Sequence, residues 1–186
     1  MTLVRVMSSP TVIAVASDTG HNVIKPVRES IRLIAGLGVE GDAHAGKTIQ
    51  HRYDKARNPD ARNLRQVHLM HAELFDQMAA LGMTVEPGQM GENITTRHLD
   101  ILGVPRGTHL KIGKAIIEVT GLRNPCKHLN KVAVGLMAAC ISRYDDGAIF
   151  PQSGVMGIVI FGGEIKAGDD IQIITPERPH SRLEPV

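Results

Sequence analysis

The sequence predicts a mainly β protein, a closed or nearly closed β-barrel with helical insertions. Two observations support this fold class. Short runs rich in β-branched residues recur along the chain, and Gly-containing links of the kind used in tight β connections separate them. The chain has 186 residues, of which 42% are hydrophobic, which suffices for a single sizeable core. We therefore expect one domain over residues 1–175 and a polar C-terminal tail over residues 176–186.

Each predicted strand is a short apolar run bounded by turn residues. Gly113-Lys114 joins two partly alternating runs, which predicts a hairpin. A second pair of strands is expected later in the chain, where Gly162-Gly163 and Gly168-Asp169 can adopt the positive φ that tight turns need. The predicted strands cover residues 12–17, 31–34, 108–112, 115–120, 155–161, 164–165 and 170–174.

Two segments depart from the β pattern. Over residues 66–81, apolar side chains recur every three or four positions, which predicts a helix that ends near Gly82. Residues 130–141 form a weaker helical pattern, because Gly135 lowers its helix propensity by about 1 kcal/mol relative to Ala. Residues 46–65 are polar and show little periodicity, so we expect a long loop, which in compact domains is often functional or mobile.

Composition argues against two classes of partner. The formal net charge is only +2, and there are no Trp, two Tyr and three Phe residues, so a nucleic-acid surface is not expected. The longest apolar run after the first strand, residues 155–161, is far shorter than the roughly 20 residues of a membrane span. Two cysteines do not make a disulfide framework, and we expect a protein of the reducing cytoplasm.

Cys126 is the residue that we expect to carry chemistry. It follows the strand that ends at Gly121, in a turn-like segment, and Arg123, Lys127 and His128 surround it in sequence. Nearby positive charge stabilises a thiolate, the form that accepts sulfur or binds a metal. A lone Cys is otherwise a small buried hydrophobe, and that interpretation holds for Cys140, which lies in an apolar helical pattern.

Two chemistries fit a reactive Cys126. As a sulfur carrier, the thiolate would hold a sulfane sulfur as a persulfide and deliver it to a metal centre or a precursor. As a metal ligand, it would bind molybdenum directly, because soft thiolates suit such centres. The sequence leaves both open, although no resolving cysteine lies nearby in sequence.

Other polar residues are weaker candidates for the site. Glu92 and Asn93 follow a Gly-flanked turn and would lie at a rim, although Asn93 equally suits a hydrogen bond to its own turn. Asp42 and His44 follow a Gly-rich bend and form either an acid–base or ligand pair, or an ordinary turn. In the loop, Arg65 at the edge of the first helix could bind an anionic ligand such as the phosphate of a pterin cofactor.

The nine histidines do not indicate zinc. His68 and His71 are three residues apart within the predicted helix of residues 66–81, but neither a His-x-x-x-His motif with a catalytic Glu nor a Cys-x-x-Cys pair accompanies them.

A set of motifs occurs in a characteristic order along the chain. They are Gly38-Val39-Glu40-Gly41-Asp42 with His44, Gly91-Glu92-Asn93-Ile94, Gly113, Val119-Thr120-Gly121, Arg123-Asn124-Pro125-Cys126, Gly157, Gly162-Gly163 and Gly168-Asp169. In this order they resemble the MOSC domain, the C-terminal domain of molybdenum-cofactor sulfurases. The resemblance covers about residues 13–173 of the chain.

The resemblance implies a pocket formed by the Asp42, Asn93 and Arg123 segments around Cys126. It implies sulfur transfer or a bound molybdenum cofactor (molybdopterin), with Cys126 as catalytic residue or metal ligand. The cofactor contacts that we expect are Arg123, Asn93, Glu92, Asp42, Arg65 and His128. In eukaryotic sulfurases the domain follows one that uses pyridoxal phosphate. This chain has no room for that domain, so pyridoxal phosphate is not expected.

The sequence leaves partners and functional class open. A sulfur donor or a redox partner protein would serve the enzyme. The alternative is a non-catalytic binding or adaptor module that recognises an anionic metabolite or a protein partner through residues 46–65. Substrate, strand order and oligomeric state do not follow from sequence periodicity.

Overall fold

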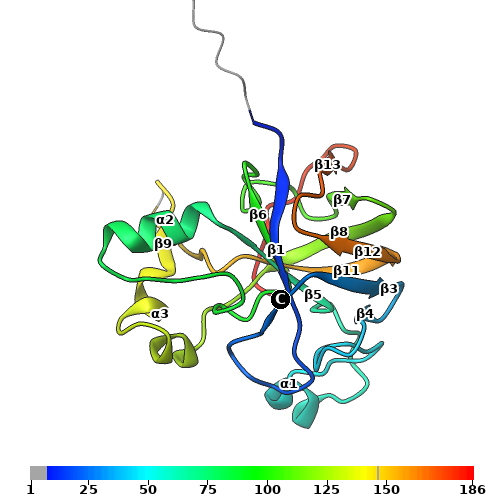
Figure 1. The fold of residues 1–186 in the computed structure, drawn as a ribbon, viewed down its shortest axis with the longest axis horizontal. Helices are drawn as coiled ribbons and strands as arrows, with labels where there is room; N and C mark the ends of the chain where they lie inside the picture. The colour runs from blue at the N-terminus through cyan, green and yellow to red at the C-terminus, as the bar shows by residue number, and fades with distance from the viewer. Residues whose placement is uncertain (1–7, 146) are drawn as a thin grey trace, which may run out of the picture.

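The structure, a computed structural model, describes residues 8–145 and 147–186, which form a mainly β fold (Figure 1). The strands are β1 (Thr11–Ala16), β2 (Val27–Arg28), β3 (Ser30–Ile34), β4 (Gly38–Val39), β5 (Val67–His71), β6 (Ile94–Arg97), β7 (His109–Ile112), β8 (Ala115–Leu122), β9 (Ile141–Arg143), β10 (Ile149–Pro151), β11 (Val155–Phe161), β12 (Gly163–Lys166) and β13 (Ile171–Ile174). The helices are α1 (Arg52–Arg57), α2 (Glu73–Ala80), the 3-10 helix η1 (Lys127–Lys131) and α3 (Leu136–Ala139).

The largest sheet has the strand order β13-β7-β8-β11-β5-β6-β1-β2. Its pairs are antiparallel except for β5 and β6, which run parallel and are connected through α2. A parallel pair needs such a crossover, because the chain must return to the starting edge before the second strand begins. A second sheet contains β12, β3 and β4, and β9 pairs with β10.

The predicted hairpin of residues 108–120 is confirmed, whereas the second predicted pair is not. β7 and β8 pair around Gly113, whose φ is +56°. β11 instead pairs with β5 and β8, β12 with β3, and β13 with β7. A Cβ on Gly162 would lie 2.6 Å from the carbonyl oxygen of Leu33, so Gly162 allows the chain to leave β11 and pass close to β3.

The prediction of a closed or nearly closed barrel is wrong. Among the described residues the sheets are open: β13 at one edge pairs with β7, and β2 at the other edge pairs with β1. Closure would require the two edge strands to hydrogen-bond to each other. β2 has only two residues, and the chain instead places β3 and β12 in a separate sheet that packs against β1.

The predicted helix of residues 66–81 is wrong in its first half. Residues 67–71 form β5, and only Glu73–Ala80 are helical. All five residues of β5 are buried, because both faces of the strand are covered: Val67 and Leu69 belong to the core of the sheets and Met70 to the core beneath the helices. An apolar run buried on both faces has no alternation, so its spacing also fits a helix. Residues 130–141 are helical only in part, and Gly135 (φ +84°) separates η1 from α3.

The core has two parts. One lies within the β-sheets and includes Val15, Leu69, Ile117 and Val155. The other, with Met70, Phe75 and Leu136 among its members, packs α2 and α3 against β5. In Figure 1 the helices α2 and α3 lie on one side of β1, and β7, β8 and β12 lie on the other.

The predicted loop of residues 46–65 and the predicted tail of residues 176–186 both contain ordered contacts or structure. The 46–65 segment contains α1. In the tail, Leu183 is buried in the sheet core, and the carbonyl oxygen of Glu184 accepts a hydrogen bond from the backbone N–H of Leu122 at 2.8 Å. Over the described residues, the helices are all too short or too polar to cross a bilayer.

Candidate functional site

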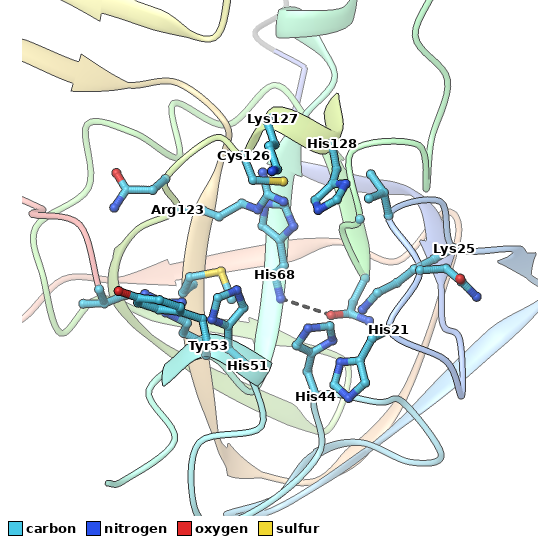
Figure 2. A pocket seen from close by; sticks show the side chains of 18 residues that line it. His21, Lys25, His44, His51, Tyr53, His68, Arg123, Cys126, Lys127 and His128 are labelled. Carbon is cyan, nitrogen blue, oxygen red and sulfur yellow. Dashed lines mark hydrogen bonds between the residues drawn. The ribbon is translucent and has the colours of Figure 1, made fainter. Parts of the chain in front are cut away.

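A cavity of about 570 Å³ opens where the ends of several strands meet (Figure 2). β5 contributes His68, the residue before β6 is Asn93, and the segment that follows β8 contributes Arg123 and Cys126. Four lining residues are basic, namely Lys25, Arg65, Arg123 and Lys127. Five are histidines, namely His21, His44, His51, His68 and His128. Within the described part of the chain, no Asp or Glu lines it.

Cys126 lies at the point where β8 gives way to η1. Its backbone is extended (φ −114°, ψ 158°), and its carbonyl oxygen accepts the first hydrogen bond of η1, from the N–H of Leu129 at 3.0 Å. The side chain is half-buried and lines the cavity, and Figure 2 shows its sulfur beside the end of the Arg123 side chain. The thiol is therefore reachable from the cavity, as a ligand or nucleophile must be.

The backbone of Arg123 is held by hydrogen bonds, but its guanidinium group is only partly hydrogen-bonded. Its N–H donates to the carbonyl oxygen of Gly154 at 3.0 Å, and its own carbonyl accepts from the hydroxyl of Ser153 at 2.6 Å. Burial lowers the pKa of the guanidinium, and the charge and hydrogen bonding of Cys126 act in the opposite direction. Nη1 is shielded from solvent and finds no hydrogen-bond partner among the described residues.

Cys140 behaves as predicted, as a small buried hydrophobe. Its side chain is fully buried in the helical part of the core. Burial raises the pKa of the Cys140 thiol to about 11, against a smaller lowering by Arg123. The two thiols thus have opposite environments, which makes Cys140 a matched control for Cys126.

Asp42 does not line the cavity but lies behind it and positions residues that do. Its Oδ2 accepts hydrogen bonds from Nζ of Lys25 at 2.7 Å and from Nδ2 of Asn93 at 2.9 Å. Its Oδ1 accepts one from the backbone N–H of His44 at 3.0 Å. Burial alone would raise the pKa of Asp42, but the hydrogen bonds from His44 and the charge of Lys25 outweigh it and hold that pKa well below its usual range.

Asn93 lines the cavity and ties three segments together. Its Oδ1 accepts from the backbone N–H of His68 at 3.1 Å, the contact drawn as a dashed line in Figure 2. Its Nδ2 donates to Asp42 and to the carbonyl oxygen of Ala16 at 3.2 Å. The Asn93 side chain thus bonds to residues far away in sequence, whereas the side chain of an ordinary turn residue bonds to the backbone of its own turn.

Glu92, by contrast, is fully buried beneath the cavity and does not line it. Its Oε1 accepts from the N–H of Gly88 at 2.6 Å and from the hydroxyl of Thr95 at 3.0 Å, and its Oε2 accepts from the N–H of Met90 at 3.0 Å. Burial raises the pKa of Glu92, and these hydrogen bonds oppose the shift. Glu92 therefore shapes the turn before β6, and the expected rim position does not apply to it.

Arg65 and His128 both line the cavity, from segments far apart in sequence. Arg65 follows the loop that contains α1, and its backbone N–H donates to Oδ1 of Asn63 at 2.9 Å. His128 is exposed in the first turn of η1, next to Cys126. The structure thus brings Asn93, Arg123, Cys126, His128 and Arg65 together around one space.

Sequence reasoning missed Lys25 and the structural role of His68. Lys25 is 3% exposed and pairs with Asp42, but no local pattern distinguishes it from a surface lysine. His68 is buried, and its Nε2 donates to the carbonyl oxygen of Ser153 at 2.7 Å. Burial, reinforced by the charge of Arg123, lowers the pKa of His68 well below its usual value. His68 is therefore neutral near neutral pH.

Comparison with known proteins identifies the architecture. A family model described as MOSC domain matches residues 41–172. The fold is similar to the YuaD protein of Bacillus subtilis, with a TM-score of 0.75 and 18% identity over 91% of this chain and 98% of that chain.

YiiM proteins are also similar in fold. The Escherichia coli protein has a TM-score of 0.60 and 20% identity over 92% of this chain and 73% of that one. The Geobacillus stearothermophilus protein has a TM-score of 0.60 and 17% identity, over 89% and 75% respectively. No curated protein matches the chain.

Proposed function

Because this chain belongs to the MOSC domain family, which is associated with molybdenum-cofactor-related proteins, we propose that its cavity holds a molybdenum cofactor with Cys126 as a ligand of the metal. The observation that carries the proposal is the position of Cys126, half-buried in a cavity that is lined by basic and imidazole side chains and, among the described residues, by no Asp or Glu. Soft thiolates suit such metals, and cationic walls suit the phosphate of a pterin cofactor.

Arg123 supports the fit of an anionic cofactor. A guanidinium presents five N–H donors in a rigid fork, and Nη1 of Arg123 has no partner among the described residues although it is shielded from solvent. An anion in the cavity would satisfy this donor. The volume of about 570 Å³ also lies within the range of pockets that bind small molecules and cofactors.

The residues of the chain have separate tasks in this proposal. Cys126 would hold the metal, and Arg123 with Arg65 and Lys127 would bind the anionic part of the cofactor. Asp42 holds Lys25 and Asn93 in place through hydrogen bonds of 2.7 and 2.9 Å, so the ammonium group of Lys25 is oriented before a ligand arrives. When bound, the cofactor would supply two-electron chemistry at the metal.

Sulfur transfer is the second candidate, and the position of Cys126 next to exposed residues favours it. Cys126 lies at the mouth of the cavity beside the exposed residues Lys127 and His128, where a donor protein can reach it. A persulfide on Cys126 needs neither the cavity volume nor the unpaired donor of Arg123. For that reason cofactor binding accounts for more of the site.

The test is the metal and pterin content of the protein purified from a host that makes the cofactor. We expect molybdenum and pterin in the wild-type protein and in Cys140→Ser, and loss of both in Cys126→Ser. Arg123→Met should lower the cofactor content about 10-fold or more, because it removes a charge-assisted contact.

Intact mass separates the alternatives. A wild-type protein that carries one added sulfur on Cys126, with neither molybdenum nor pterin, would support sulfur transfer in place of cofactor binding. A wild-type protein with none of the three would overturn both.

A further inference from the structure

A second cavity, of about 550 Å³, lies on the far side of β5 from the Cys126 site. His68 of β5 lines the first cavity, and His71 of the same strand lines the second. Residues an odd number of positions apart point to opposite faces of a strand. The second cavity therefore has its own walls, and a ligand bound in it would be independent of the proposed cofactor.

Two polar atoms of this cavity are buried without a hydrogen-bond partner. They are Nδ1 of His71 and Oε2 of Glu73, and neither has a partner within the part of the chain that the structure describes. His71 is 9% exposed, and burial lowers its pKa, so its ring is neutral near neutral pH. Buried polar groups are almost always paired in proteins, so two unpaired atoms in residues that line one cavity point to a ligand that pairs them.

The carboxylate of Glu73 is held in a fixed position. It stands at the first position of α2, and its Oε1 accepts a hydrogen bond from the N–H of His98 at 2.7 Å. His98 has a φ of +61°, which a side-chain-bearing residue adopts at a cost, and this conformation presents its N–H to Glu73. A carboxylate is favourable at the start of a helix, and the hydrogen bond from His98 satisfies Oε1 of Glu73. Oε2 is left for a ligand.

The walls determine what kind of ligand fits. Tyr144 and Phe150 stack with ring centroids 4.1 Å apart, and both line the cavity, as do Leu99 and Leu102. Asp100 adds a second carboxylate, and the described lining contains no Lys or Arg. The lining thus combines an apolar, aromatic wall with the acceptors of Glu73, His71 and Asp100, and the guanidinium of Arg182 lies 4.3 Å from the centroid of the Tyr144 ring.

We propose that this second cavity binds a small organic cation, a primary ammonium group carried on an apolar or aromatic body. The ammonium donates to Oε2 of Glu73 and to Nδ1 of His71, and the body packs against Tyr144 and Phe150. A metal ion is a poorer candidate, since the described residues hold no group of three or more potential metal ligands. A primary ammonium group has three N–H donors, two of which these acceptors would take, and its organic body needs an apolar wall, which this cavity has.

Benzylamine is a suitable probe, with benzyl alcohol as its neutral counterpart of similar shape. Titration of the protein with each compound is followed by the backbone amide NMR signals. We expect saturable shifts with benzylamine at His71, Glu73 and Tyr144, and binding of benzyl alcohol at least about 10-fold weaker, because a charged hydrogen bond is lost.

Glu73→Gln is the decisive variant. It removes the charge but keeps an oxygen that can accept from His98, so the fold of this corner is preserved, and benzylamine affinity should fall about 10-fold or more. Asp76→Asn is the matched control, since Asp76 also lies on α2, pairs with Arg97 at 2.8 Å and does not line the cavity. It should bind benzylamine as the wild-type protein does.

Three results would overturn the proposal. They are equal affinity for benzylamine and benzyl alcohol, unchanged affinity in Glu73→Gln, and no saturable shift at residues of this cavity. Cys126→Ser should bind benzylamine normally, so the outcome is independent of the first site.

Discussion

At the scale of single residues, Asp42 holds in place residues that line the first cavity, although it does not line the cavity itself. One carboxylate accepts hydrogen bonds from Lys25, Asn93 and the backbone of His44. The side chains of Lys25 and Asp42 are 2% and 0% exposed, so the pair is screened little by solvent. Loss of one partner therefore leaves the other charge buried without compensation.

Asp42→Asn should destabilise the protein by about 3–5 kcal/mol, since it breaks a buried ion pair and leaves Lys25 unpaired. Urea denaturation of the wild-type protein and the variant measures this. Lys25→Met combined with Asp42→Asn should recover most of the loss, because no isolated charge remains. A double variant as unstable as Asp42→Asn alone would show that the ion pair is not the cause. Asp76→Asn, at the surface, should leave the unfolding free energy nearly unchanged.

At the scale of elements, the turn that leads into β6 depends on Glu92. The carboxylate receives hydrogen bonds from Gly88, Met90 and Thr95 and lies beneath the cavity floor. Gly91 in the same turn has a φ of +81°, and a Cβ there would lie 3.0 Å from the carbonyl oxygen of Val23. The hydrogen bonds of Glu92 thus stabilise the turn, and the close approach of Gly91 to Val23 leaves little room there for a side chain.

Glu92→Gln should destabilise the protein by about 1–3 kcal/mol, because its amide nitrogen would face a hydrogen-bond donor and leave it unpaired. Thermal unfolding checks the size of the effect. Glu86→Gln is the matched control, since Glu86 is exposed just before the same turn and its side chain accepts no hydrogen bond from Gly88 or Met90. Equal melting temperatures for Glu92→Gln and Glu86→Gln would contradict the assigned role.

Helices and strands can be predicted from sequence where neighbouring residues carry the pattern. The prediction fails for a strand whose two faces are both buried. The hairpin of β7 and β8 follows from Gly113 and two partly alternating runs. The spacing of apolar residues in β5 indicates a helix, because a strand covered on both faces shows no alternation and its apolar residues run on into α2. The pairing of β12 with β3 joins residues far apart in sequence, which no local signal encodes.

At the scale of the whole molecule, two buried histidines make stability depend on pH. Burial lowers the pKa of His68 and of His71 in the folded protein, whereas in the unfolded chain both titrate near 6.5. Below that value the unfolded chain binds protons that the folded protein does not. Their contribution to stability is therefore complete above pH 6.5 and is lost as the pH falls towards the folded-state pKa values.

His68→Gln should flatten this dependence. The glutamine amide can still donate to the carbonyl of Ser153 but does not titrate, so the slope of unfolding free energy between pH 6.5 and 5 should fall by up to about 1.4 kcal/mol per pH unit. Urea denaturation at a series of pH values measures both slopes. Identical slopes in the wild-type protein and His68→Gln would show that His68 is not protonated on unfolding in this range.

The site as a whole is partly predictable from sequence. Its motifs are short segments, whereas the residues that hold the lining side chains in place are distant in sequence. Arg123 and Cys126 share one short segment, so the sequence alone places a thiol near a guanidinium, and both residues line the cavity. Lys25 lines the cavity and pairs with Asp42, which is 17 positions away in sequence, and Glu92 is fully buried, which its rim-like sequence context does not indicate. Whether a sheet closes into a barrel depends on the pairing of strands far apart in sequence, and the number of strands alone does not reveal this pairing.

The most direct test of the central claim is the alkylation rate of Cys126 with and without bound cofactor, followed by peptide mass spectrometry. The thiol is accessible in the cavity, so iodoacetamide should modify it readily in cofactor-free protein. Protein loaded with the molybdenum cofactor should be protected at Cys126, because its sulfur is occupied by the metal. Buried Cys140 should stay unmodified in both samples and report an intact fold. Equal rates at Cys126 in loaded and cofactor-free protein would contradict the claim that this thiol holds the cofactor.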